Sequence, residues 1–262
     1  MYNKYITIIT AENKERYLYD TIKSCLKELS NLNTKIYIVY TKLYNEKTLK
    51  QKFIDNKKII FIKSKFKKKL PTQDQLLKIE NILKYLKNEW ILLLDGDDLF
   101  KANKIKTLNK LKLNKNNIYL HNHEKSYGNK IRVEKEKIYK KNFIFKKMFN
   151  DWPEKINTSS IILSANLLRK FYKNCNPYEW KYLAIDVQLV LYFYYKKKFK
   201  FLNKILTSKK ENINNLDKTF TGITNKKFWI RRFEQHELTK KLSGKKNYID
   251  RFVTLILMNI FK

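Results

Sequence analysis

Residues Trp90 to Phe100 read WILLLDGDDLF, an apolar run that ends in three carboxylates within four positions. The run predicts a strand that is buried on both faces, as in a parallel sheet. Its carboxyl end carries Asp95, Asp97 and Asp98. Carboxylates this close raise one another's pKa, so the cluster is costly unless a cation or ligand donors neutralise it. An Asp-Gly turn followed by a helix cap is the alternative interpretation, since both residues are common in turns.

Apolar runs alternate with amphipathic helical patterns through the first hundred residues. Strands are predicted at Tyr5 to Thr10, Lys35 to Thr41 and Lys58 to Ser64, and helices around Leu18 to Leu29 and Leu76 to Leu86. This alternation is typical of a parallel α/β sheet, whose ligands bind beyond the carboxyl ends of the strands. Thr10-Ala11-Glu12-Asn13 and Asp95-Gly96-Asp97-Asp98 both lie at such ends.

The pattern is less regular after Phe100. Strands are predicted at Asn116 to His123, Asn157 to Ser164 and Phe199 to Thr207, and helices at Ala184 to Tyr195 and Tyr248 to Phe261. The sequence shows no internal repeat and no linker rich in Pro, Gly or Ser. We therefore expect one domain over residues 1–208, with halves 1–100 and 101–208, and a basic helical extension over 209–262.

The bulk composition indicates a folded protein with anionic partners. The chain has 262 residues, 43% of them hydrophobic, and its 58 Lys and Arg against 24 Asp and Glu give a net charge of +34. Nucleic acid, anionic lipid and phosphorylated ligands are the partners that such a charge favours. Cys25 and Cys175 form no metal or disulfide pattern, so a reducing cytoplasm is expected. Any membrane contact is expected to be peripheral, because no apolar run is long enough to span a bilayer.

Three stretches together resemble the family 2 glycosyltransferases. ITIITAENKERYLYDTIKSCL from Ile6 is similar to the family's first strand, loop and helix, and LLLDGDDLF from Leu92 to its Asp-x-Asp motif. SSIILSANLLRKF from Ser159, followed by AIDVQLVLYFYYKKKFKFLNKILT from Ala184, resembles the acceptor-side strand and helix. The three stretches also occur in the family's order.

The resemblance implies a GT-A fold, an α/β architecture with a Rossmann-like nucleotide-binding half containing a mixed sheet, an acceptor-binding half and here a helical C-terminal extension. It implies that Asp97, with Asp98 close by, holds a divalent metal, Mn²⁺ or Mg²⁺, and that Asp95 meets the ribose or a metal-bound water. Contacts to the nucleotide sugar are assigned to Thr10, Ala11, Glu12, Asn13, Tyr40, Lys78, Asp95, Gly96 and Asp97. In place of the family's Arg/Asn-rich loop, the candidate phosphate contacts are Lys65, Lys67, Lys68, Lys69 and Lys78.

The chemistry implied by the resemblance also needs a base. A nucleoside diphosphate leaving group carries several negative charges, which a metal held by carboxylates neutralises. A separate carboxylate must accept the proton of the attacking sugar hydroxyl. Asp186, alone in an apolar and aromatic segment, fits that role, although an Asp at a helix start also serves as a cap. The nucleotide base stays open, because Tyr40-Thr41 ends the second strand without the acidic residue that reads uracil.

The sequence therefore predicts an inverting, metal-dependent glycosyltransferase. Its donor is a nucleotide diphosphate sugar, and its acceptor is a surface glycan such as capsule or lipooligosaccharide, free or lipid-linked, at the inner face of the cytoplasmic membrane. The alternative is a nucleic-acid-binding protein without catalytic activity. The acidic cluster argues against nucleic acid as the partner, as does the spread of basic residues along the whole chain.

The C-terminal segment combines an apolar stripe with basic residues. The stripe runs along residues 248–261 and is flanked by Lys245, Lys246, Arg251 and Lys262, after a basic stretch from Phe228 to Lys241. This pattern predicts a helix that lies on an anionic bilayer. Docking of the stripe on the protein's own core or on a second subunit is the alternative.

Overall fold

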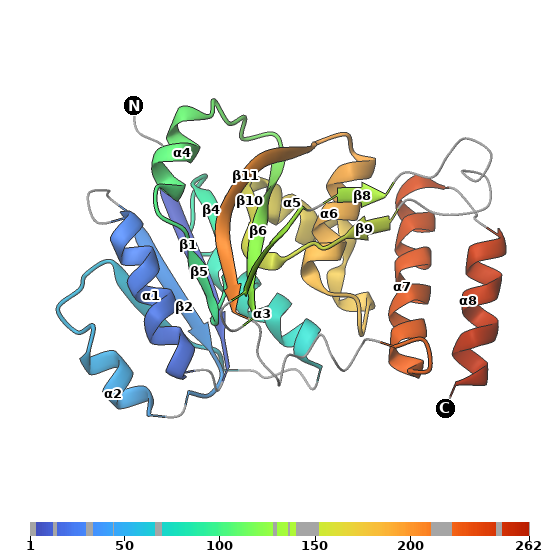
Figure 1. Ribbon diagram of the computed structural model, residues 1–262, viewed down its shortest axis with the longest axis horizontal. Helices are drawn as coiled ribbons and strands as arrows, with labels where there is room; N and C mark the ends of the chain where they lie inside the picture. The colour runs from blue at the N-terminus through green and yellow to red at the C-terminus, as the bar shows by residue number, and fades with distance from the viewer. Residues whose placement is uncertain are drawn as a thin grey trace.

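The computed structural model describes residues 4–12, 15–29, 34–43, 45–65, 70–127, 130–135, 137–139, 152–210, 222–244 and 248–261. Asn13 and Lys67 to Lys69, assigned to the ligand site above, lie outside the described residues. The chain folds as a twisted mixed sheet between two layers of helices, with two further helices at one end of the molecule (Figure 1).

Within the described residues, nine strands form the main sheet in the order β3-β2-β1-β4-β10-β6-β11-β5, with β7 paired to β6. Their bounds are β1 (Tyr5–Ala11), β2 (Lys35–Tyr40), β3 (Ile59–Lys63), β4 (Trp90–Asp95), β5 (Asp98–Phe100), β6 (Ile118–Tyr127), β7 (Lys130–Glu134), β10 (Ile161–Ser164) and β11 (Phe199–Lys210). Strands β3, β2, β1 and β4 are parallel, and β10 then runs antiparallel between β4 and β6. Strand β11 is parallel to β6, and β5 is antiparallel to β11. Strands β8 (Lys137–Tyr139) and β9 (Trp152–Glu154) pair separately.

The helices divide between the two faces of the sheet. Helices α1 (Glu15–Leu29), α2 (Glu46–Gln51) and α4 (Lys104–Lys110) pack on one face, and α3 (Pro71–Leu83), α5 (Ala165–Cys175) and α6 (Ile185–Tyr195) on the other. Two short 3-10 turns, η2 (Thr158–Ser160) and η3 (Pro177–Glu179), precede β10 and α6. Helices α7 (Lys226–Ser243) and α8 (Tyr248–Ile260) stand at the end beyond α6 (Figure 1).

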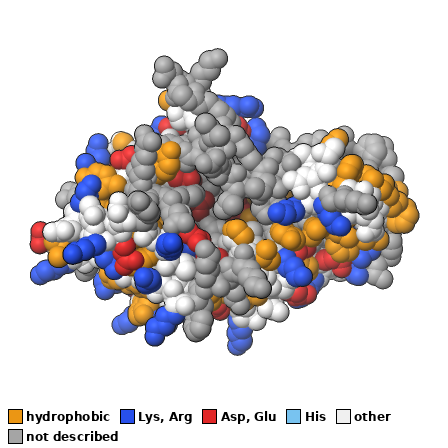
Figure 2. All heavy atoms as spheres, turned by 90° about the horizontal axis from the view of Figure 1, so that it is seen from below, with side chains coloured by type: hydrophobic (Ala, Val, Ile, Leu, Met, Phe, Trp, Pro, Cys, Tyr) orange, Lys and Arg blue, Asp and Glu red, His pale blue; other side chains and the backbone are white. Residues whose placement is uncertain are grey.

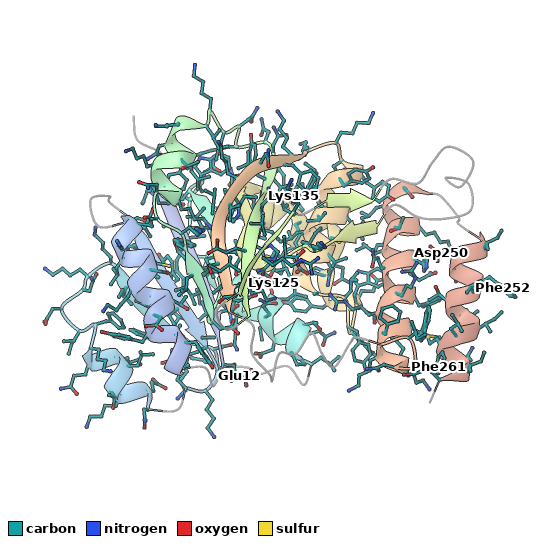
Figure 3. All side chains as sticks on the ribbon, viewed as in Figure 1. Glu12, Lys125, Lys135, Asp250, Phe252 and Phe261 are labelled. Carbon is teal, nitrogen blue, oxygen red and sulfur yellow. The ribbon has the colours of Figure 1, made fainter. Side chains whose placement is uncertain are left out.

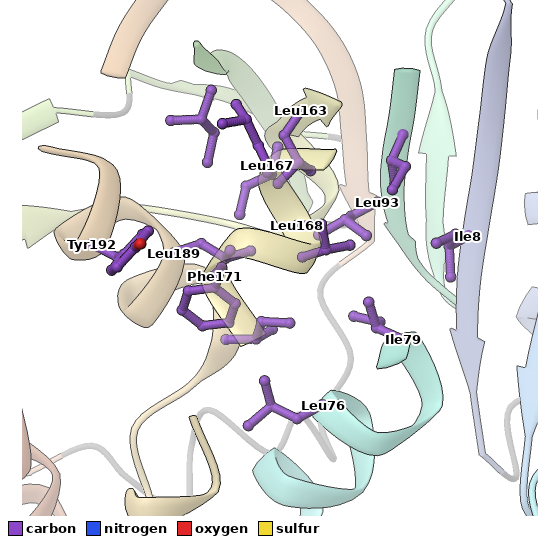
Figure 4. Close-up of a cluster of buried hydrophobic side chains, with 14 of the residues drawn as sticks. Ile8, Leu76, Ile79, Leu93, Leu163, Leu167, Leu168, Phe171, Leu189 and Tyr192 are labelled. Atoms are coloured by element: carbon purple, nitrogen blue, oxygen red, sulfur yellow. The ribbon is translucent and has the colours of Figure 1, made fainter. Parts of the chain in front are cut away.

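The apolar run Trp90 to Leu94 explains why both faces are covered. Side chains alternate between the faces of a strand. Ile91 and Leu93 therefore join the core beneath α3, α5 and α6, part of which Figure 4 shows, while the other three residues of the run join the core beneath α1. A strand with no polar face is stable only when helices exclude water from both sides.

Most elements predicted from the sequence are present, and the α/β mixed-sheet fold is confirmed. The strand predicted from Asn157 to Ser164 is shorter than expected. The Asn157 side chain accepts a hydrogen bond from the Ser159 N–H and caps the η2 turn, so the strand begins at Ile161. Asp98 begins the short strand β5 rather than a helix, because β11 pairs with it.

Gly96 allows the ends of β1 and β4 to approach each other closely. Thr10 pairs with Asp95 across the two strands, and the Gly96 N–H donates to the Thr10 carbonyl at 3.0 Å. A Cβ at position 96 would lie 3.2 Å from the Cβ of Ala11 and 3.2 Å from the Thr10 carbonyl oxygen. The acidic motif and the end of β1 are thus held together at the carboxyl edge of the sheet.

We expect Gly96→Ala to lower the free energy of unfolding by about 1–3 kcal/mol, the usual cost of an added methyl in a packed site. Urea denaturation measures this cost. Ala11→Gly removes one of the two contacts, so the double variant should lose less stability than the sum of the single variants. Strict additivity would contradict the close approach.

Candidate active site

Asp95 is held by side chains from two other elements. Its Oδ1 accepts a hydrogen bond from Gln75 Nε2 at 2.8 Å and one from Thr10 Oγ1 at 3.5 Å. Gln75 also donates to Thr10 Oγ1 at 3.2 Å, so one amide joins the ends of β1 and β4. Asp95 is partly exposed. The Asp95 carboxylate is therefore fixed in position at the surface of the edge.

Asp98 points into the fold and is bound by the segment before β10. Its Oδ2 accepts hydrogen bonds from Ser159 Oγ at 2.6 Å and from Asn157 Nδ2 at 3.1 Å. Ser159 Oγ in turn accepts the N–H of Asp95 at 2.9 Å. One buried hydroxyl thus ties the backbone of Asp95 and the carboxylate of Asp98 to the turn that precedes β10.

The charge of Asp98 is incompletely compensated. Burial raises the pKa of Asp98 to about 6, with Lys209 opposing the rise and Asp97 adding to it. Asp98 Oδ1 is buried and has no hydrogen-bond partner among the described residues. Asp97 is adjacent and is itself 6% exposed. An orphaned carboxylate oxygen beside a second carboxylate is a donor set that suits a hard divalent cation.

The acidic residues fit such a cation only if further oxygens come from elsewhere. Among the described residues, no group of three or more His, Cys, Asp or Glu side chains is arranged to hold a metal. Mg²⁺ and similar ions are commonly bound by one or two carboxylates together with substrate phosphates and water. Asp97 and Asp98 meet that lower requirement.

A second polar network lies behind Ser159. The Ser159 carbonyl accepts a hydrogen bond from Thr207 Oγ1 at 3.1 Å, and Lys104 Nζ donates to Thr207 Oγ1 and to His121 Nε2, each at 3.0 Å. Burial and the Lys104 ammonium hold the pKa of His121 well below its usual range. His121 is therefore neutral, with Nδ1 donating to the Asn122 carbonyl. The network fixes β11 and β6 against the turn that carries Ser159.

The first turns of α3 connect the acidic motif to the segment that precedes Asp186. Thr72 Oγ1 donates to the Lys181 carbonyl at 2.6 Å, and Gln73 Nε2 donates to the Tyr178 carbonyl at 3.0 Å. Gln75, two positions on, holds Asp95. The start of one helix thus brings the end of β4 and the approach to α6 to the same edge of the sheet.

Lys78 is buried in an ion pair rather than open to a ligand. Its Nζ lies 2.8 Å from Asp74 Oδ2 and 3.6 Å from Glu12 Oε2, and it donates to the Ala11 carbonyl at 3.2 Å. Only 4% of the Lys78 side chain is exposed. We therefore assign Lys78 to positioning the loop after β1, where Figure 3 shows Glu12 just beyond the tip of the strand.

The side chain of Tyr40, predicted to contact the nucleotide sugar, is buried at the end of β2. Its side chain is fully buried, and its hydroxyl donates to Glu46 Oε1 at 2.5 Å. As the last residue of β2 it turns toward α2 and packs in the core beneath α1. The side chain of Tyr40 is therefore used inside the fold, and the predicted contact of this residue with the nucleotide sugar stays a prediction.

Asp186 lies in the first turn of α6, as the sequence predicts. Its Oδ1 accepts the N–H of Val187 at 2.7 Å, and the residue is 9% exposed. The side chain thus satisfies a free N–H at the start of its own helix, where negative charge is favourable. This contact engages one oxygen and matches the capping alternative, while a base role needs the other oxygen to meet an acceptor hydroxyl.

The carboxyl edge forms a recess. Figure 2, seen from below, shows acidic side chains in the hollow near the middle of the molecule, with Lys and Arg at several points around it. Thr10, Ala11, Glu12, Asp95, Gly96 and Asp97 all belong to the two strand ends that meet at this edge.

Gln75, Asn157 and Ser159 are positioning residues that the sequence did not identify. Gln75 falls in a polar run, PTQDQ, at a helix start, and Asn157 and Ser159 fall in NTSS before an apolar strand. Polar residues in both places are usual as caps and turns, so composition alone gives no reason to place them on the carboxylates. A correct prediction that β10 pairs with β4 would have placed Ser159 close to the acidic motif.

The sequence matches no protein-family model and no curated protein. Solved structures do resemble it. The structure of S. aureus TarS 1-349 in complex with UDP-GlcNAc has 12% identity and a TM-score of 0.60, over 98% of this chain and 71% of that one. The mannosyltransferase PcManGT from Pyrobaculum calidifontis, in complex with GDP-Man and Mn²⁺, has 7% identity and a TM-score of 0.56, over 99% and 75%. The fold is GT-A-like.

The contribution of the Ser159 hydroxyl to stability can be tested by comparison with Ser160. Ser159→Ala leaves the Asp95 N–H and Asp98 Oδ2 each without one partner, so we expect a loss of about 1–3 kcal/mol in the free energy of unfolding at pH 8. Ser160→Ala is the matched control, because Ser160 is equally buried but its hydroxyl has no hydrogen-bond partner among the described residues. Equal losses in the two variants would refute the role of Ser159.

Proposed function

We propose that the protein is a glycosyltransferase of the family 2 type that moves a sugar from a nucleotide diphosphate sugar to a glycan acceptor. The observation that carries the proposal is the acidic motif at the carboxyl edge of a GT-A-like sheet, where Asp95 is held in place and one oxygen of Asp98 has no hydrogen-bond partner among the described residues. Two of the solved structures with a similar fold are complexes with UDP-GlcNAc and with GDP-Man. The fold favours this function over the nucleic-acid-binding alternative.

Asp97 and Asp98 would hold a divalent metal, Mn²⁺ or Mg²⁺. When bound, the metal neutralises charge on the departing diphosphate. Support comes from the orphaned Oδ1 of Asp98, from the raised pKa of that carboxyl, and from the Mn²⁺ in the PcManGT structure. Asp95, at the exposed edge, would meet the ribose or a metal-bound water, with Thr10, Ala11, Glu12 and Gly96 beside it.

Asp186 would act as the general base of an inverting transfer. The acceptor hydroxyl gives its proton to Asp186 as its oxygen bonds to the anomeric carbon, and the bond from that carbon to the diphosphate breaks. A nucleoside diphosphate then leaves with the bonding electron pair. The hydrogen bonds from the start of α3 to Tyr178 and Lys181 support this role, since they hold the approach to Asp186 at the edge that carries the acidic motif.

The acceptor is proposed to be a surface glycan, such as capsule or lipooligosaccharide, free or lipid-linked, at the inner face of the cytoplasmic membrane. The net charge of +34 supports an anionic surface or anionic acceptor. In this scheme residues 1–208 form the transferase domain and residues 209–262 an extension that serves the membrane.

The metal site predicts a specific response to pH. Asp98 has a pKa of about 6 in the fold against an ordinary value of 3.8, so in chelator its contribution to stability should fall as pH rises from about 4 to about 6. With manganese and UDP or GDP, the melting temperature should rise more at pH 7.5 than at pH 5, because a proton on Asp98 competes with the metal. A thermal-shift titration checks both trends.

Variants of the acidic motif test the same site. Asp98→Asn should remove both the loss of stability between pH 4 and 6 and the manganese effect, since a neutral amide neither titrates nor holds the cation. Asp97→Asn should remove the manganese effect and leave the pH trend of Asp98 largely in place. Calorimetric affinities for manganese and nucleotide that match the wild type in both variants would contradict the metal assignment.

Asp186→Asn should leave nucleotide binding intact and lower the transfer rate by roughly 10² or more, the scale for a lost general base. Glu179→Gln is the comparison, because Glu179 is an exposed carboxylate that precedes the same helix. Glu179 pairs with Lys241 at 2.5 Å. Single-turnover assays and calorimetry on both variants separate binding from turnover. If Asp186→Asn turned over normally and Glu179→Gln did not, the base would be Glu179.

A further inference from the structure

Helices α7 and α8 pack as a pair at the end of the molecule farthest from β3. Helix α7 contacts α6 on one side and α8 on the other, so α8 is the outermost element (Figure 1). The ring of Trp229 in α7 stacks on Phe261 at the end of α8. One face of α8 is thus fixed to α7, and the opposite face points away from the protein.

The inner face of α8 is polar in the first half of the helix. Asp250 and Thr254 are buried against α7, where Asp250 Oδ1 lies 3.1 Å from Arg232 Nη2 and Thr254 Oγ1 lies 3.2 Å from His236 Nε2. In addition, Arg251 donates to Glu237 at 2.5 Å. In this first half of α8, polar and charged groups therefore occupy the side that an ordinary surface helix fills with apolar residues.

The outer face of α8 is apolar. The residues there recur at intervals of three and four, and their exposed fractions are 44% for Ile249, 62% for Phe252, 45% for Val253, 41% for Ile256 and 60% for Ile260. In Figure 3, Phe252 points outward and Asp250 lies on the side of α7. A contiguous apolar stripe of this kind marks a surface that binds a partner or a membrane.

The charge around the stripe is one-sided. Residues 226–262 contain ten Lys and Arg and three Asp and Glu, a net charge of +7. All three carboxylates are used internally: Glu234 accepts the backbone N–H groups of residues 181–183, Glu237 pairs with Arg251, and Asp250 pairs with Arg232. The surface of the helix pair therefore combines an apolar stripe with basic residues. In the described part of the pair, every carboxylate is already bonded within the protein.

We propose that the outer face of α8 lies in the interface of an anionic lipid bilayer, with the cations of α7 against the headgroups. The combination of an exposed apolar stripe and a net positive charge fits an interfacial helix. Among the described helices none has the length and hydropathy to cross a bilayer, which agrees with a helix that lies on the surface. A second copy is a poorer occupant, because it would bring a second +7 surface against the first. The inference deepens the proposed function and rests on it for the membrane-bound acceptor, but α8 is assigned from its own geometry.

The test uses the full chain and vesicles of phosphatidylglycerol mixed with phosphatidylcholine, with phosphatidylcholine alone as the neutral lipid. We expect wild type to float with the anionic vesicles at low salt and to bind the neutral ones much less. Phe252→Ser/Ile260→Ser should weaken binding by at least about tenfold, because two exposed apolar side chains leave the interface. The matched control, Ile54→Ser/Ile131→Ser, makes the same change at residues that are 76% and 67% exposed on other surfaces, and should bind like wild type.

A second variant tests the charge without touching the stripe. Lys226→Gln/Lys227→Gln changes two exposed lysines at the start of α7. Each charge removed should weaken vesicle binding by about fivefold at low salt and by less at high salt. Melting temperatures and activity on a short soluble acceptor should stay at the wild-type level in every variant. A wild-type protein that bound anionic vesicles but transferred no sugar would count against the transferase proposal and not against the membrane inference.

Three results would overturn the inference. Wild type could fail to bind anionic vesicles at low salt, or both the serine and the glutamine variants could bind as wild type does. Alternatively, light scattering could show a wild-type dimer that the serine variant converts to a monomer, without vesicle binding. That result would make a second copy the occupant of α8.

Discussion

Three carboxylates at the end of one buried strand impose an electrostatic cost, and much of the described site is arranged around it. The fold directs these carboxylate side chains toward different parts of the structure. Asp95 turns to an amide from α3, and Asp98 turns inward to a hydroxyl and an amide from the turn before β10. Uncharged donors hold the two carboxylates in position. The motif is therefore structurally fixed, while Asp98 keeps one buried oxygen without a hydrogen-bond partner among the described residues, and a cation bound there would satisfy it.

The same solution also joins the two halves of the chain. Ser159 lies in the second half of the chain and bonds to both Asp95 and Asp98, while the start of α3 lies in the first half and bonds to the segment leading to α6. Each half thus supplies hydrogen bonds that position the candidate residues of the other. A chain with such reciprocal contacts builds its site only when both halves are folded.

The sequence predicts the fold well because its strongest signals are local. The run Trp90 to Leu94 has no polar face, and that alone requires two helical layers. The partners of the carboxylates are different, because Gln75 and Ser159 reach them through tertiary contacts that no sequence period encodes. The bond from the Tyr40 hydroxyl to Glu46 is another tertiary feature that the sequence did not indicate. The apolar stripe of α8 is visible in the sequence. That it faces away from the protein is known only from the structure, in which Asp250 on the other side of the helix pairs with Arg232 of α7.

Glu234 gives the helix pair a mechanical connection to the candidate base. By accepting the N–H groups of residues 181–183, it clamps α7 to the loop that enters α6, where Asp186 lies. A helix pair held in this way cannot pivot freely about the sheet and its helical layers. If α8 rests on a bilayer, Asp186 then stands at a set height above the lipid, and the protein would measure its acceptors by how far their terminal sugar projects from the membrane.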